Sequence, residues 1–248
     1  MEDQSRVYGQ QQFDLPHDVV QLPSEGRFYK NKKKAIKVGY LTAADENILL
    51  SNAADITGAL LRNKIYEPDL RIDDLLEGDI EAILIFLRNT SFGPEMLLNL
   101  TDPQTKKPFQ SNISLAELYV KKTQFEPNED GTFTTNLPKS GAVVRLKLLT
   151  YGESNELQRA IDSYPVGRPA PKVTMKLQKH IVELNGSQDR VEISKFVESM
   201  PIADSKFIRK FLEDNEPRLD MVKEVIAPSG ERLTVNVGLG VEFFRPFF

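Results

Sequence analysis

The chain has 248 residues, enough for one large domain or two small ones. Its net charge of −4 argues against a general nucleic-acid binder, because such proteins use a basic excess to displace counterions from phosphate. The absence of cysteine excludes disulfides, thiolate metal sites and cysteine nucleophiles. The longest apolar run, Ile83 to Leu87, is too short to cross a bilayer, so we expect no membrane partner.

Residues 1–20 are expected to form a polar N-terminal arm. The Pro and Gly of Leu22–Gly26 predict a turn, and the period-two apolar spacing of Ala35–Tyr40 predicts a strand with one buried face. Thr42 has an acid three residues later, a pattern typical of a helix start. We expect that helix to continue through an apolar stripe as far as Leu60.

A second group of elements is expected before residue 120. Ile72, Leu75 and Leu76 predict a short apolar helix, and Asp79 is the predicted N-cap of the next one. Turn residues after Leu100 then predict a β-hairpin that reaches about Ile113.

The same order of patterns recurs in the second part of the chain. The corresponding features are a Leu-Pro turn at Leu137–Gly141, a strand at Val143–Leu148, a helix start at Thr150, a short helix around Ile193, Phe196 and Val197, an N-cap at Asp204 and a hairpin from Val225 to Val237. Pro171–Gly186 is extra, and the alternation of Val173, Met175 and Leu177 predicts an added strand or hairpin.

These patterns predict an α+β fold with two related halves, each with the order strand/turn–helix–helix–β-hairpin. The expected organisation is an arm (1–20), a first half (21–120), a connecting hairpin or linker (121–136), a second half (137–240) and an aromatic C-terminal tail (241–248).

Residue patterns for catalysis are missing from the sequence. It has no P-loop, and its two histidines, His17 and His180, have no acid or second histidine at a spacing that would close a metal site. The paired acids lie at expected helix starts or on polar helix faces. We therefore expect no catalytic residue, no metal and no cofactor.

Two segments are candidates for binding a partner. Lys32, Lys33 and Lys34 belong to a basic run at an expected hairpin tip, which would be a solvated loop, a contact for an acidic partner, or a patch for phosphate or nucleic acid. The C-terminal segment carries Phe243, Phe244, Arg245, Phe247 and Phe248. Aromatic residues with an arginine are typical of interface hot spots, so this tail either packs back on the second half or inserts into a partner. In an extended chain, Phe243 and Phe244 would point to opposite faces.

Several of these segments resemble one family. Leu22–Gly26 with Tyr29, Thr42–Glu46 with Leu49, and Met200-Pro201 with Asp204 and a terminal Phe-Phe are similar to baseplate hub and hub-assembly proteins of T-even-like contractile-tailed bacteriophages. The resemblance extends over about Leu22 to Phe244. It implies a non-catalytic role in building the baseplate hub, with other hub proteins and the tape measure protein as candidate partners. It also implies assembly in the host cytoplasm and a place in the virion tail.

The resemblance leaves alternatives open. The protein would be a hub component that stays in the virion, or an assembly chaperone that leaves it. A more distant alternative is an unrecognised hydrolase or nucleotide-binding enzyme. Members of the family that the chain resembles often carry cysteine pairs near the two expected hairpins, whereas this chain has none. If those cysteines bind zinc in relatives, packing and turn residues must hold the hairpins here.

Overall fold

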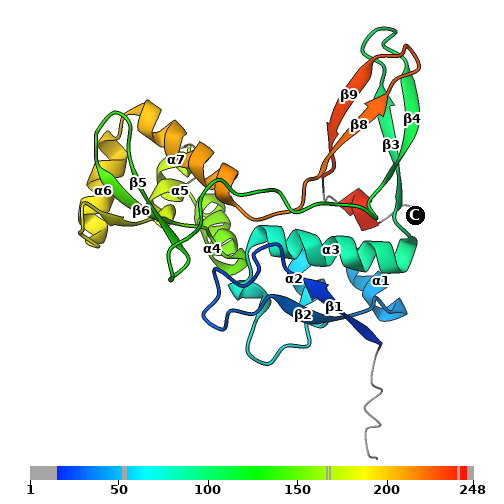
Figure 1. The fold of residues 1–248 in the computed structure, drawn as a ribbon, viewed down its shortest axis with the longest axis horizontal. Coiled ribbons are helices and arrows are strands. Elements are labelled where there is room, and N and C mark those ends of the chain that lie inside the picture. The colour runs from blue at the N-terminus through cyan, green and yellow to red at the C-terminus, as the bar shows by residue number, and fades with distance from the viewer. Residues whose placement is uncertain (1–15, 52–54, 166, 168, 239–240, 245–248) are drawn as a thin grey trace, which may run out of the picture.

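The computed structural model describes residues 16–51, 55–165, 167, 169–238 and 241–244. Its helices and small antiparallel sheets confirm the α+β class (Figure 1). In chain order the elements are β1 (His17–Gln21), β2 (Ala35–Gly39), α1 (Ala43–Leu49), α2 (Ile56–Leu61), η1 (Ile72–Asp74), α3 (Glu77–Phe92), β3 (Glu95–Thr101), β4 (Pro108–Ser114), β5 (Thr132–Asn136), β6 (Val143–Lys147), α4 (Tyr151–Asp162), α5 (Lys172–His180), β7 (Ile181–Leu184), α6 (Arg190–Ser199), α7 (Ile202–Asn215), β8 (Val222–Ile226), β9 (Arg232–Asn236) and η2 (Val241–Phe244).

Both Leu-Pro turns connect two antiparallel strands. β1 pairs with β2 before and after the first turn, so residues 17–20 belong to a sheet and not to a polar arm. β5 pairs with β6 around the second turn, which places the last residues of the expected linker in a sheet as well. Of the five residues in β1, only Val20 is buried, which explains why a strand was hard to recognise there.

The two predicted helix starts at threonine are confirmed. Thr42 is the N-cap of α1 and Thr150 is the N-cap of α4, each with an acid at the third helical position that bonds back to the threonine N–H. The single helix expected to extend to Leu60 is wrong, because α1 ends at Leu49. Asp55 starts a separate helix, α2, by accepting the Gly58 N–H at 2.7 Å.

Asp79 and Asp204 are not N-caps. They are the third residues of α3 and α7, whose N-caps are Leu76 and Pro201. Both aspartates are fully buried, and each accepts a backbone N–H from a Leu-Pro turn: Ser24 N–H binds Asp79 at 2.9 Å, and Lys139 N–H binds Asp204 at 2.8 Å. Each carboxylate therefore ties a helix to a distant turn and does not cap its own helix.

The extra segment of the second half is a helix followed by a strand. Val173, Met175 and Leu177 lie in α5, so the strand predicted from their alternation is wrong at that place. Three alternating positions are too few to separate a strand from a helix, and of these three only Leu177 is buried. The added strand, β7, follows directly and extends the sheet to the order β5-β6-β7.

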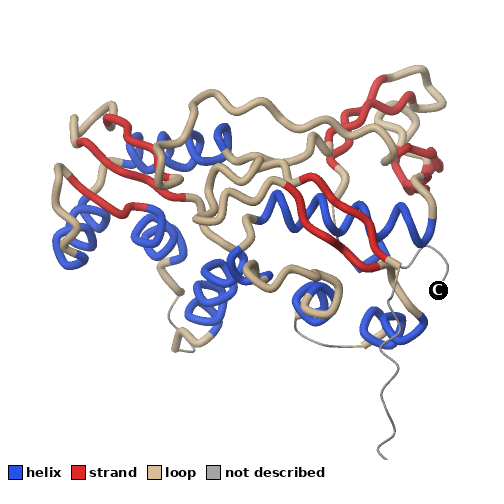
Figure 2. The backbone as a smooth tube through the Cα atoms, turned by 60° about the horizontal axis from the view of Figure 1, so that its bottom comes forward, coloured by secondary structure: helices blue, strands red, loops and turns tan. Residues whose placement is uncertain are grey.

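The two predicted hairpins exist as β3–β4 and β8–β9, but they begin earlier than expected, at Glu95 and Val222, because the turn residues taken to precede them form their tips. They lie side by side and project from the helical body (Figures 1 and 2). In the first half the hairpin follows α3 directly. In the second half, residues 216–221 carry the chain from α7 across to the first hairpin.

The halves share one contiguous hydrophobic core, with α3 near its centre (Figure 1). Between them, Tyr151 N–H donates to Leu75 O at 2.8 Å, and the Arg218 guanidinium binds Glu81 at 2.6 Å. Gly78 is required at this contact, since a Cβ there would lie 2.1 Å from the Pro217 carbonyl oxygen.

Candidate functional site

The C-terminal aromatic segment is folded onto the first half. Phe243 and Phe244 lie in η2, only 1% and 7% exposed, beside the end of α3 (Figure 1). Their rings meet edge to face with centroids 5.1 Å apart. The expectation that they point to opposite faces is wrong, because a 3-10 helix and not an extended strand holds them.

Arg88 on α3 forms the base of this contact. Its guanidinium carbon lies 5.5 Å from the centroid of the Phe243 ring, a cation–π arrangement. Its side chain also donates to the carbonyl oxygens of Gly93 and Glu95, which fixes the chain between α3 and β3. Burial lowers the pKa of Arg88. Sequence reasoning missed this residue, although a lone arginine among the apolar residues of α3 was a usable signal.

The three lysines of the basic loop have different roles. Lys33 forms ion pairs with Glu67 and Asp69, and the Lys32 ammonium donates to the Glu129 carbonyl oxygen at 3.0 Å. These two lysines therefore tie the loop to other parts of the same chain, whereas Lys34 is exposed.

The loop and the C-terminal aromatics are not brought together. The loop binds residues 67, 69 and 129, whereas η2 packs on Arg88. Arg245, Phe247 and Phe248 lie outside the described residues.

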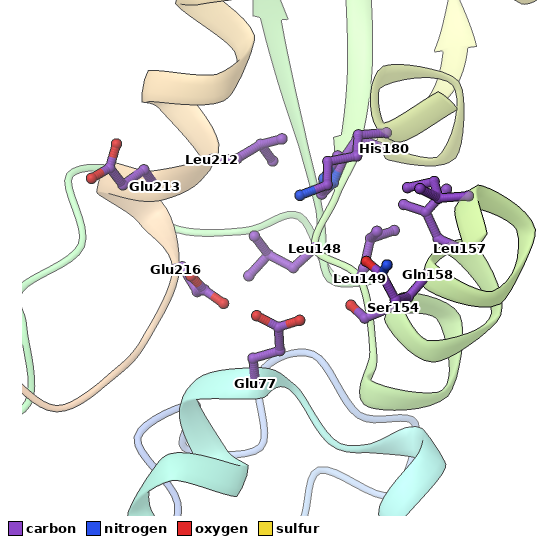
Figure 3. Close-up of a pocket in the computed structure, with 12 residues that line it drawn as sticks. Glu77, Leu148, Leu149, Ser154, Leu157, Gln158, His180, Leu212, Glu213 and Glu216 are labelled. Carbon is purple, nitrogen blue, oxygen red and sulfur yellow. The ribbon is translucent and has the colours of Figure 1, made fainter. Parts of the chain in front are cut away.

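A cavity of about 320 Å³ lies between the halves. It is lined from the start of α3, from α4 and α5, and from the end of α7, and the carboxyl groups of Glu77 and Glu216 point toward each other across it (Figure 3). Burial, reinforced by Glu77 and Glu81 and opposed by Arg218, raises the pKa of Glu216 to about 7. Within the described residues, no group of three or more acids and histidines is placed to hold a metal ion.

We expect Glu216 to make folding pH-dependent. Its folded pKa of about 7 exceeds the usual 4.5, so its stabilising contribution is full below pH 4.5 and is lost as pH rises through 7. Glu216→Gln should therefore raise the free energy of unfolding relative to wild type at pH 8, by roughly 2–3 kcal/mol, and flatten its fall between pH 5 and pH 8. Urea unfolding of both proteins at several pH values measures this.

His180 also makes stability depend on pH, so the effect of Glu216 is measured as the difference between Glu216→Gln and wild type at each pH. Its Nδ1 lies 2.9 Å from Lys147 O, and burial lowers its pKa, so its own contribution to stability falls as pH is lowered. Glu213→Gln removes the same charge at an exposed position on the rim of the cavity. If Glu213→Gln flattens the pH dependence as much as Glu216→Gln does, burial of Glu216 is not the cause.

The tips of the two hairpins are joined by a hydrogen-bonded aspartate. Asp102 accepts from the Ser229 N–H at 3.0 Å and from the Ser229 hydroxyl at 2.9 Å. It also accepts from the Gln104 and Thr105 N–H groups of its own turn, and these bonds lower its pKa against the effect of desolvation. The hairpins are thus held by a polar contact in addition to packing.

This contact predicts a non-additive pair of substitutions. Ser229→Ala should lower the melting temperature in the wild-type background, because it removes one donor to Asp102. In an Asp102→Ala background the same change should have almost no effect, since the acceptor is already gone. A double-mutant cycle by thermal unfolding measures this, and equal effects of Ser229→Ala in both backgrounds would show that the two turns are not coupled.

The profile of a known family, described as T4 bacteriophage base plate protein, matches residues 18–231. The match covers both Leu-Pro turns, both buried aspartates and most of the paired hairpins. The chain belongs to this family of phage base plate proteins. Searches of curated proteins and of solved structures gave no match. Over the residues that the structure describes, no helix is long and apolar enough to span a bilayer.

Proposed function

We propose that this protein is a non-enzymatic structural component of the baseplate hub that binds other hub proteins. The family match over residues 18–231 is the observation that carries the proposal. The paired hairpins support it, because they project from the helical body, where a neighbour can reach them (Figure 1). The tape measure protein is a further candidate partner, and we expect no nucleic-acid or membrane partner.

We propose that the tail has two parts with different roles. Phe243 and Phe244 anchor it to α3 beside Arg88, at the base of the hairpins. Arg245, Phe247 and Phe248 follow this anchor and supply the contact with a neighbouring hub protein. Lys34, which is exposed, is the member of the basic loop best placed to contact an acidic partner surface.

Deletion of Arg245–Phe248 tests the second role. We expect the shortened protein to unfold at nearly the wild-type temperature and to lose copurification with co-expressed hub proteins of the same phage. Lys34→Glu serves as a separate test of the basic loop and should weaken copurification without lowering the melting temperature. A shortened protein that still copurifies at the wild-type level would show that the tail is not the contact.

We also propose that the two halves are copies of one ancestral unit. Each has a strand, a Leu-Pro turn, a second strand, a helix capped by threonine, a short helix, a longer helix and a hairpin, in that order. The equivalent hydrogen bonds from Ser24 and Lys139 to Asp79 and Asp204 support this further, because they join the same two positions in each half. On this basis β1 belongs to the first half and β5 to the second.

A further inference from the structure

We propose that the outer face of β8 binds an extended segment of another base plate protein, in which lysine or arginine alternates with apolar side chains. The surface consists of the outward side chains of residues 220–226 and of the adjoining segment 117–119, and we call it the β8 face. The proposal rests on the function proposed above, because it names the kind of neighbour that the projecting hairpins contact (Figure 1).

The exposure of side chains alternates along β8 and the residues just before it. Met221 and Val225 are buried in the core, which fixes the orientation of the strand. The side chains that point the other way are exposed, and they alternate between acidic and apolar in the order Asp220, Val222, Glu224 and Ile226. Val222 and Ile226 are 49% and 69% exposed, so this face shows apolar area to water between its acids.

The segment 117–119 widens the β8 face. Asp220 N–H donates to Tyr119 O at 2.8 Å, and the Lys223 ammonium donates to Glu117 O at 3.3 Å. Opposed residues of an antiparallel pair point to the same side, so the Tyr119 side chain lies beside that of Asp220. Tyr119 is 75% exposed, and Glu117 is exposed as well. The face thus combines acids with large apolar side chains: Glu117, Asp220 and Glu224 with Tyr119, Val222 and Ile226.

The acids of the β8 face have little compensation from cations of the same chain. In the part of the chain that the structure describes, Glu117 and Asp220 form no ion pair. Glu224 lies 3.6 Å from the Arg232 guanidinium, but their side chains are 69% and 78% exposed, so solvent screens this pair. The face therefore favours a neighbour that brings positive charge.

The negative charge disfavours two other occupants. A second copy bound through the same face across a two-fold axis would set acids against acids. Nucleic acid and anionic lipid would bring phosphate to the same carboxylates and be repelled. The apolar side chains between the acids instead fit a protein segment that covers them.

The spacing of the β8 face favours an extended partner. Its exposed positions on β8 are two residues apart, which is about 6.6 Å along a strand. A strand laid over them within about 30° of the same direction repeats at nearly the same distance. Such a strand can place one cation over Asp220 and the next over Glu224, with apolar side chains over Val222 and Ile226.

Photo-cross-linking of the full-length chain, co-expressed with the other base plate proteins of the same phage, tests this contact. A photoreactive phenylalanine analogue takes the place of Ile226, and mass spectrometry identifies the captured peptide. We expect that peptide to come from a base plate protein and to carry basic residues alternating with apolar ones. The matched control has the analogue in place of Val191, which is 60% exposed on α6, at the other end of the molecule from the hairpins (Figure 1). It should not capture this peptide.

Charge reversal tests the electrostatic part with the captured partner after purification. Glu224→Lys should raise the Kd by more than about tenfold, because it replaces attraction by repulsion. Added NaCl should weaken wild-type binding, since salt screens exposed charges. Glu198→Lys reverses an exposed acid on α6 and should bind as wild type does. Unchanged melting temperatures would show that both variants fold.

The outcomes separate the β8 face from the function on which it rests. A complex that forms without capture at position 226, a captured peptide without basic residues, or a Glu224→Lys variant with the wild-type Kd would overturn the β8 face and leave the hub function standing. A wild-type chain that binds none of the co-expressed base plate proteins would overturn both.

Discussion

Asp79→Ala should lower the free energy of unfolding by about 2–4 kcal/mol, which is the expected cost of leaving two buried donors without an acceptor. The Asp79 carboxylate accepts from the Ser24 N–H and from the Tyr29 hydroxyl, and that hydroxyl in turn accepts from the Leu76 N–H. Burial raises the pKa of Asp79 above its usual range, so these bonds are what stabilise a carboxyl group in the core. Chemical denaturation of the full-length chain measures the loss.

Two further variants show whether the loss of stability comes from the buried hydrogen bonds of Asp79. Tyr29→Phe removes one donor and should cost less than Asp79→Ala, about 1–2 kcal/mol. Glu46→Ala removes an exposed acid from the first turn of α1 and should change stability by less than about 0.5 kcal/mol. An Asp79→Ala protein as stable as Glu46→Ala would mean that the turn and α3 are held together by apolar packing alone.

Phe243→Ala should cost about 3–5 kcal/mol, the range for removing a fully buried phenylalanine. The loss combines the cavity left by the ring with the uncovering of the Arg88 guanidinium, which now stacks on it. Thermal and urea unfolding of the full-length chain measure this effect.

Phe243→Ala also shows whether Phe243 belongs to the core or to a contact with a partner. Tyr119→Ala is the control, because Tyr119 is 75% exposed and its loss should change stability by less than about 0.5 kcal/mol. If Phe243→Ala is as stable as Tyr119→Ala but fails to bind hub proteins, Phe243 is a partner contact and not part of the core.

The local patterns in the sequence were enough to predict the α+β class, both hairpins and the two threonine caps. Capping and turn formation depend on residues within a few positions of each other, so both can be recognised from a single sequence. An added strand was also expected, but it lies at Ile181–Leu184, because the alternating residues Val173, Met175 and Leu177 belong to α5, in which only Leu177 is buried.

Long-range partners could not be predicted in this way. Asp79 was interpreted as an N-cap because a helix start was expected there, whereas its partner Ser24 is 55 residues away. The Phe243 ring depends on Arg88 in the other half, and the extended geometry expected for the tail was replaced by a 3-10 helix. Lys33 stays a candidate for binding a partner, and its ion pairs with Glu67 and Asp69, more than 30 residues away, could not be predicted from the sequence.

We propose that this chain, a member of the phage base plate family, is a component of the baseplate hub that remains in the virion. Quantitative mass spectrometry of purified virions, and of baseplates isolated from them, tests it most directly. We expect the protein to be present in both, at a fixed ratio to the other hub proteins. Its presence in infected-cell extracts together with its absence from virions would contradict the account and identify a transient assembly chaperone.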